Sequence, residues 1–292
     1  MVPWSAQTMD LTAGSRLQHF TLERQIGAGG MGTVWAARDE RSGAAAALKI
    51  IRVTDAGAMD TLRSRLLREA HATRAISHPA IVPVLDVVDY EGSPVLVMDL
   101  LEGETLRARL LREQRLGLSQ VAGLLLPVVE ALGAAHRAGI VHRDLKPENI
   151  FLQAGSSPRV RLLDFGVARF YEPPANTGDV PLTGVGTLLG TLAYMAPEQA
   201  LQPSECDPRV DVWALGVILY ETLSGSRPIE GANGPETMRQ LLIGGITPLP
   251  VMMPTLPEAI TTLVGRMLSR SPEKRPQDLG LIAEALRAHL DA

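Results

Sequence analysis

The sequence predicts an α+β fold in two lobes, and three observations support this. Short apolar segments separated by glycines come first, helical periodicity begins after Gly103, and a later helix is apolar on nearly every side. Strands followed by helices are typical of α+β proteins, in which the two kinds of element segregate. We expect a leader at 1–18, an N-terminal lobe at 19–101 and a C-terminal lobe at 102–292.

The N-terminal lobe is expected to be mainly antiparallel sheet. Apolar segments between 19 and 51 are separated by glycine clusters and by the turn sequence DERSG, a pattern typical of hairpins. A helix is expected over 60–76, because apolar residues recur every four positions and His78-Pro79 ends the pattern. Further strands are expected at 81–90 and 94–100.

Helices should dominate the C-terminal lobe. Ser119 is expected to cap a helix that stops at Gly139, while Pro127 removes one hydrogen bond and bends it. Residues 210–223 are apolar on nearly every side, which is typical of a helix in the middle of a core. The last helix should span roughly 279–290.

Composition excludes several classes of protein. Of 292 residues, 46% are hydrophobic and 21% are charged, as in ordinary globular enzymes, and the net charge of -4 argues against a nucleic-acid binder. The single cysteine, Cys206, cannot form a disulfide within the chain, which favours a reducing, cytoplasmic setting. No signal peptide and no membrane segment are expected from the apolar runs.

The segment GAGGMGTV, which begins at Gly27, fits the pattern G-x-G-x-x-G-x-V between two expected strands. Glycines let the backbone approach phosphate oxygens closely and offer N–H donors to them. A plain glycine-rich hairpin would give the same pattern, so this segment alone does not identify a nucleotide site. A strand follows it rather than a long helix, which argues against a dinucleotide-binding arrangement.

Lys49 stands inside an otherwise apolar strand, where its ammonium group needs an anion. A solvated lysine at a sheet edge is the alternative. Glu69, on the helix expected at 60–76, is the candidate partner, but several arginines lie on the same helix and spacing alone does not establish the pair.

The string HRDLKPEN at 142–149 places three functional groups on what should be one tight loop. Asp144 can accept the proton of an attacking hydroxyl, Lys146 can neutralise charge on a phosphoryl group, and Asn149 can hold a metal ion. Asp164, of the sequence DFG, follows an apolar strand and offers the second oxygen ligand that Mg²⁺ favours. Together these residues predict a phosphoryl-transfer site.

These motifs resemble the signature set of protein kinases. The string HRDLKPEN would arise by chance in a chain of this length with odds on the order of one in a hundred million, so the match is specific. DLKPEN is similar to serine/threonine rather than tyrosine kinases, and HPAIV and YMAPEQA are similar to the bacterial branch of the eukaryotic type. In the family's order, over about 20–290, stand GAGGMGTV, Lys49 of AALK, Glu69, HRDLKPEN, DFG, APE at 196–198, DVWALG at 211–216 and Arg275.

The resemblance implies an ATP site. The glycines would cover the phosphates, Lys49 would hold the α- and β-phosphates with Glu69 behind it, and residues 99–101 would be the hinge that binds adenine, with Met98 as gatekeeper. The implied nucleotide-binding residues are Ile26, Gly27, Ala28, Gly29, Gly30, Met31, Gly32, Thr33, Val34, Ala47, Lys49, Met98, Asp99, Leu101 and Phe151.

The resemblance also implies the remaining catalytic and structural roles. Asp144 would orient the substrate hydroxyl, Lys146 would steady the γ-phosphate, and Asn149 with Asp164 would bind Mg²⁺, for which Mn²⁺ could substitute. In the family, a buried ion pair ties the end of the activation segment to the C-terminal lobe, and an aspartate on the central helix braces the catalytic loop. The residues implied for these two roles are Glu198, Arg275 and Asp211.

Regulation by phosphorylation is expected in the segment 164–198. A phosphate there would order the segment by pairing with a cluster of arginines, for which Arg65, Arg143 and Arg169 are the implied members. Thr187 is the first choice of phosphosite and Thr183 the second, the alternative being that both are ordinary polar loop residues.

The expected function is an active serine/threonine protein kinase that acts on protein substrates and forms a homodimer for trans-autophosphorylation. Two alternatives are a pseudokinase scaffold and a small-molecule kinase of the same fold. Scaffolds typically lose the lysine or one of the two aspartates, and all three are present here. The long segment that ends in APE serves a peptide substrate, which argues against a small-molecule kinase.

Overall fold

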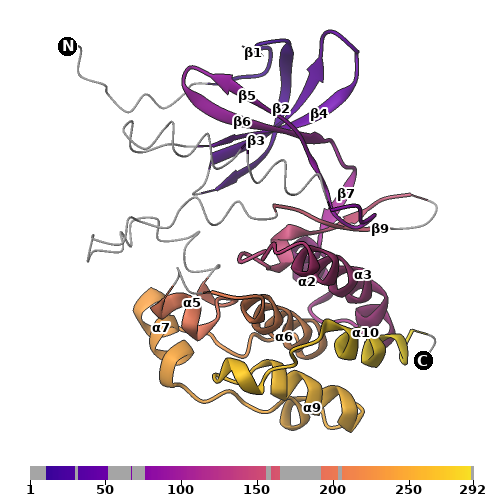
Figure 1. The fold of residues 1–292 in the computed structure, drawn as a ribbon, viewed down its shortest axis with the longest axis vertical. Coiled ribbons are helices and arrows are strands. Elements are labelled where there is room, and N and C mark those ends of the chain that lie inside the picture. Colours follow the sequence, from indigo (N-terminus) through magenta and orange to yellow (C-terminus); the bar gives the residue numbers. More distant parts are fainter. Residues whose placement is uncertain are drawn as a thin grey trace. The chain divides into compact units, whose positions relative to one another are not determined.

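The structure is a computed structural model, and it describes residues 11–29, 32–51, 67, 76–155, 159–164, 192–202 and 206–290 (Figure 1). The chain divides into two compact units. Unit 1 comprises Met1–Ala75 and Pro83–Leu101, and unit 2 comprises Ile76–Val82 and Glu102–Ala292.

Unit 1 is built on a six-stranded antiparallel sheet with the strand order β1-β2-β3-β4-β6-β5. Successive strands pair as hairpins, except that β4 pairs with β6. The helix expected at 60–76 lies almost entirely outside the described residues. The strands are β1 (Arg16–Leu17), β2 (Phe20–Gly29), β3 (Gly32–Asp39), β4 (Ala45–Ile51), β5 (Val84–Tyr90) and β6 (Ser93–Asp99).

The two faces of this sheet differ in character. Trp35, Leu48 and Val97 lie opposite one another on β3, β4 and β6, and all three belong to the hydrophobic core of unit 1. Side chains alternate between faces along a strand, and directly paired residues share a face. The neighbouring positions Ala47 and Lys49, with their partners, therefore lie on the face opposite this core.

The start of unit 1 differs from the expected leader at 1–18. Leu17 is fully buried and pairs with Phe20, so that β1 and β2 form a hairpin. Gln18, between the two strands, has a φ of 53°, a value that few residues other than glycine adopt. The sequence did not predict this hairpin, because β1 has only two residues and is too short to show an alternating pattern.

Unit 2 is mainly helical. A three-stranded antiparallel sheet, β7-β8-β9, is its only sheet within the described ranges. Its elements are β7 (Gly103–Thr105), α2 (Leu106–Glu113), α3 (Leu118–Arg137), η2 (Pro147–Asn149), β8 (Ile150–Gln153), β9 (Arg159–Leu162), α5 (Pro197–Leu201), α6 (Arg209–Ser224), α7 (Gly234–Ile243), α8 (Leu249–Met252), α9 (Glu258–Met267), η5 (Pro272–Lys274) and α10 (Leu279–Arg287).

Residues 76–82 belong to unit 2, although the sequence placed them in the N-terminal lobe. The backbone N–H of Val82 donates to the carbonyl of Leu162 at 3.1 Å, and Ile81 forms a parallel bridge with Leu162. These backbone hydrogen bonds attach the segment to β9. The lobe boundary drawn from sequence therefore misses a short segment, because its partner lies far along the chain.

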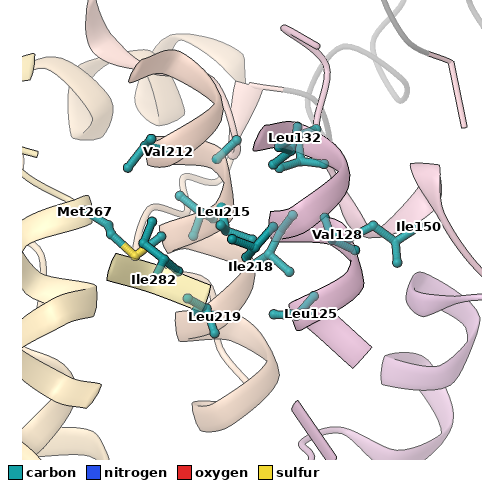
Figure 2. Packing of buried hydrophobic residues seen from close by; sticks show 14 of the residues in the cluster. Leu125, Val128, Leu132, Ile150, Val212, Leu215, Ile218, Leu219, Met267 and Ile282 are labelled. Atoms are coloured by element: carbon teal, nitrogen blue, oxygen red, sulfur yellow. The ribbon is translucent and has the colours of Figure 1, made fainter. Parts of the chain in front are cut away.

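Helix α6 is the centre of the core of unit 2. Every residue from Val210 to Leu223 is buried, as the apolar pattern predicts. Figure 2 shows Leu215 and Ile218 of α6 between side chains of α3, such as Val128, and Met267 of α9. At Gly216 an added Cβ would stand 2.8 Å from the Cβ of Met267, so the close approach of α6 and α9 requires glycine there.

The ends of the long helices differ in detail from the predictions. The N-cap of α3 is Gly117, and Ser119 lies inside the helix, where its hydroxyl donates to the carbonyl of Leu290 at 2.7 Å. The prediction that Ser119 caps the helix is therefore wrong, because a tertiary partner takes its hydroxyl. Pro127 is accommodated within α3, and α10 ends at Arg287, short of the expected 290.

By length and composition, α3 could cross a membrane, and it is the only such helix among the described residues. Half of the relevant window is buried inside the protein, where Leu125, Val128 and Leu132 pack in the core of unit 2. A core helix meets the same criteria as a membrane span, and the packing of α3 accounts for its apolar composition.

Candidate active site

A buried carboxylate organises the loop that carries HRDLKPEN. Asp211 of α6 is 1% exposed, and it accepts hydrogen bonds from the backbone N–H groups of His142 and Arg143, each at 2.8 Å. The Nε2 atom of His136, in the last turn of α3, lies 2.8 Å from the same carboxylate. A buried carboxylate needs such donors, and here they fix the backbone of the loop to two helices.

Three polar side chains of this loop form one hydrogen-bonded cluster. The Nζ atom of Lys146 lies 2.9 and 2.8 Å from the two carboxylate oxygens of Asp144. The amide of Asn149 donates to the backbone carbonyl of Asp144 at 2.7 Å and to its carboxylate at 3.2 Å. Asp144 is 8% exposed and Asn149 is 5% exposed, so the cluster is largely shielded from water.

Asp164 stands beside this cluster through backbone hydrogen bonds. The N–H of Leu163 donates to the carbonyl of Asn149 at 2.8 Å, which continues the pairing of β8 with β9 by one residue. The Nε2 atom of His142 lies 2.9 Å from the carbonyl of Leu163. Asp164 itself has a φ of 60°, a left-handed conformation that is uncommon outside glycine and often marks functional sites.

The donor set of the site fits a hard divalent cation. Because the Nδ2 atom of Asn149 is used as a donor, its Oδ1 atom is the amide atom left to act as a ligand. With the carboxylate of Asp164 it offers oxygen ligands of the kind that Mg²⁺ prefers. The described residues contain no group of three His, Cys, Asp or Glu side chains placed to hold a metal. Mg²⁺ commonly takes its remaining ligands from substrate phosphates and water, so two protein ligands suffice.

A second polar cluster, which the sequence did not reveal, lies next to the loop. Arg107 of α2 donates to Glu148 and to Glu221, each at 3.0 Å, and also to the hydroxyl of Tyr194. Tyr194 donates to Glu221 at 2.5 Å. Burial and the adjacent Glu221 carboxylate raise the pKa of Tyr194, so its hydroxyl remains a donor. The cluster joins α2, the end of the loop, α6 and the residues that precede α5.

Glu198 and Arg275 form an ion pair across unit 2. The guanidinium of Arg275 lies 2.5 and 2.8 Å from the carboxylate oxygens of Glu198 in a bidentate arrangement, and its side chain is fully buried. Its Cζ atom stands 5.0 Å from the ring centroid of Trp213. The next residue of α5, Gln199, donates to the carbonyl of Arg143 at 2.7 Å. Helix α5 is thereby linked to both the core and the loop.

The nucleotide-binding residues expected in unit 1 occupy adjacent strands. In the β2–β3 hairpin, Gly27 pairs with Val34 and Gly29 pairs with Gly32, whose φ is 139°. Lys49, across from Val34 on β4, is 7% exposed, so it is not a solvated edge lysine. Other expected members lie on the same sheet, with Ile26 and Ala28 on β2, Thr33 on β3, Ala47 paired with Met98, and Asp99 at the end of β6.

Of the remaining expected residues, three are described by the structure and the others are not. Phe151 lies on β8, and Arg143 donates to the carbonyl of Cys206 at 3.2 Å. Leu101 ends unit 1. The other expected site residues fall outside the described residues, namely Gly30, Met31, Arg65, Glu69, Arg169, Thr183 and Thr187.

Comparison with known proteins identifies the family. The protein kinase domain family matches residues 20–289. The chain is 36% identical over 92% of its length to serine/threonine-protein kinase pkn2 of Myxococcus xanthus and to serine/threonine-protein kinase PknA of Mycobacterium tuberculosis. It spans 32% of the former and 61% of the latter.

Solved structures agree with this assignment at the level of the fold. A double-mutant form of the PknI kinase domain of Mycobacterium tuberculosis is 25% identical, with a TM-score of 0.74 over 97% of this chain and 100% of that one. The unmutated PknI kinase domain is 24% identical, with a TM-score of 0.71 over 96% of this chain and 100% of that one. The predicted bilobal kinase fold is thereby confirmed, and the chain belongs to the protein kinase domain family.

Proposed function

We propose that this chain is a serine/threonine protein kinase, which transfers the γ-phosphoryl group of ATP to hydroxyl groups of proteins. The observation that carries the proposal is the cluster of Asp144, Lys146 and Asn149 on a loop braced by Asp211. The relatives named above are serine/threonine-protein kinases, which supports the same substrate class for this domain.

In the proposed reaction, the substrate hydroxyl oxygen forms a bond to the γ-phosphorus while the bond to the leaving oxygen of ADP breaks. Asp144 orients this hydroxyl and accepts its proton. Lys146 lies within hydrogen-bond distance of Asp144, so its charge stands where negative charge develops on the transferred group. Asp211 and His136 keep the loop in the required conformation, which makes them positioning residues.

Each part of the nucleotide has its own proposed binding groups. Backbone N–H groups of the glycine-rich hairpin and the ammonium of Lys49 bind the phosphates, with Glu69 holding Lys49. Asn149 and Asp164 would hold Mg²⁺, which neutralises charge on the phosphates when bound. Mn²⁺ prefers the same oxygen ligands and should substitute for it. We place the domain in the cytoplasm, a reducing compartment that suits the single buried cysteine.

The proposed activity can be tested by transfer of labelled phosphate from ATP to a generic basic protein in the presence of Mg²⁺. We expect transfer that yields phosphoserine or phosphothreonine, and we expect Lys49→Met to remove it, since the α- and β-phosphates lose their ligand. Circular dichroism should show that the variant remains folded. A wild type no more active than this variant would favour a pseudokinase scaffold, and transfer only to small molecules would favour the other alternative.

We further propose that the kinase is activated by autophosphorylation in the segment 164–198. Thr187 is the first candidate and Thr183 the second, and the phosphate would pair with Arg143 together with Arg65 and Arg169. Mass mapping after incubation with ATP and Mg²⁺ should locate phosphate on one of these threonines. The absence of phosphate between 177 and 191, in a sample that phosphorylates other proteins, would contradict this mode of activation.

A further inference from the structure

A groove runs between α9 and α10, on a part of unit 2 that contributes nothing to the candidate active site. Its volume is about 440 Å³, and it is lined on the α9 side by Glu258, Ala259, Thr262 and Arg266. From α10 come Ala285 and Leu281, whose side chain is half exposed. Figure 1 shows the two helices next to each other near the end of the chain.

The charges on this groove have a regular arrangement. Glu258 begins α9 and Arg266 stands eight positions later on the same exposed stripe, about 12 Å along the helix at 1.5 Å per residue. Thr262 lies midway between them. Within the described ranges, neither charged side chain forms an ion pair in the chain itself.

We propose that this face binds a second copy of the chain about a two-fold axis near Thr262, with the two α9 helices antiparallel. In that arrangement Glu258 faces the partner's Arg266, and Arg266 faces the partner's Glu258. A two-fold interface requires a surface that is complementary to itself, and an acidic end, a centre of small side chains and a basic end meet that requirement. A parallel arrangement would instead bring like charges together.

The centre of the stripe permits close approach of the two helices. Ala259 and Thr262 are small, and packed helices approach to 8–10 Å depending on the side chains between them. Gly265 lies on the same stripe, and an added Cβ there would meet no described atom within 4 Å outside the adjoining backbone of its own helix. The packing of the monomer therefore does not require glycine at this position, where glycine costs roughly 1 kcal/mol of helix stability relative to alanine.

The association should be weak. Two short helices and their groove offer less than the roughly 800 Å² per partner of a standard stable interface, so we expect a transient dimer with a dissociation constant on the order of micromolar or above. The charges also suit the helix dipole, since Glu258 is in the first turn and Arg266 in the last. Reversing either charge thus affects the helix as well, and the test must separate the two effects.

Charge-reversal variants, measured alone and mixed with each other, separate the effect on the interface from the effect on the helix. Sedimentation velocity over a range of concentrations should show self-association of the wild type that weakens with salt. Glu258→Arg and Arg266→Glu should each weaken it at least about tenfold, because like charges then face each other. An equimolar mixture of the two variants should associate again, since opposite charges face in the mixed pair. Arg24→Glu, an exposed reversal in unit 1, is the matched control and should associate as the wild type does.

Gly265→Leu supplies a steric test that does not depend on charge. Leucine favours the helix and finds open space in the monomer, so the variant should be at least as stable and yet fail to dimerise. A wild type that remains monomeric at several hundred micromolar would overturn the proposal. So would a dimer that is insensitive to all three variants, or a mixture of the two charge variants that stays monomeric.

The consequence for regulation rests on the proposed kinase activity. Pairing of two copies raises the effective concentration of one activation segment near another domain. Arg266→Glu should therefore slow autophosphorylation at low protein concentration, while protein that has already been phosphorylated should transfer phosphate to a separate protein substrate at the wild-type rate. Sedimentation does not depend on catalysis, so failure of the interface and failure of the kinase assignment are distinguishable.

Discussion

Replacing Asp144 by asparagine should reduce phosphoryl transfer by about 10²- to 10⁴-fold, the range typical of a lost general base. Asparagine has the same shape, and with its single amide oxygen in the place of Oδ2 it can still accept hydrogen bonds from Asn149 and Lys146, so the loop should keep its conformation. The loss comes from the carboxylate, which alone accepts the proton of the hydroxyl. Steady-state rates with labelled ATP give the measurement, and the Km for ATP should change little.

Asp86→Asn is a suitable control for this experiment. Asp86 is an exposed carboxylate on β5, and the same substitution there removes a charge without touching the loop. It should leave the rate unchanged. If Asp144→Asn retained more than about a tenth of the wild-type rate, Asp144 would not be the base. Thermal unfolding of the variant should match that of the wild type, which would show that misfolding does not explain the lower rate.

How far the sequence predicts this site depends on how local each interaction is. The cluster of Asp144, Lys146 and Asn149 could be predicted because all three stand within one short loop. The buried environment of α6 could be predicted because its apolar residues cover every side of one helix. In both cases the information lies within a single segment.

Interactions between distant segments could not be found in this way. Arg107 contacts Glu221 and Tyr194 from another helix, and no spacing in the sequence relates the three residues. The role of His136 could not be predicted either, because its partner Asp211 lies on a different helix. Ser119 shows the reverse case, where a strong local preference for capping a helix was overridden by a tertiary hydrogen bond to the carbonyl of Leu290.

The ion pair of Glu198 with Arg275 was predicted from the family resemblance, and its contribution to the free energy of unfolding can be measured. Glu198→Ala should lower the free energy of unfolding by about 3 kcal/mol, the low end of the 3–5 kcal/mol expected when one partner of a buried pair is removed. The low end applies because the Glu198 side chain is 26% exposed and Arg275 keeps hydrogen bonds to the carbonyls of Ser269 and Arg209, at 2.8 and 3.0 Å.

Urea unfolding followed by the helical circular dichroism signal gives the measurement, since among the described residues every helix with printed bounds lies in unit 2. A shift of the midpoint at constant slope reports a change in stability alone. Glu230→Ala is the matched control, because Glu230 pairs with Arg227 at the surface with its side chain 59% exposed. Such pairs contribute less than about 1 kcal/mol.

Removing both partners should separate the cost of an unpaired charge from the value of the pair. In Glu198→Ala with Arg275→Met, no charge remains buried, and methionine can pack against Trp213 in place of the guanidinium. We expect the double variant to be more stable than Glu198→Ala alone. If instead the losses of Glu198→Ala and Arg275→Met simply added in the double variant, the coupling energy between the two side chains would be zero, and stabilisation by the ion pair would be contradicted.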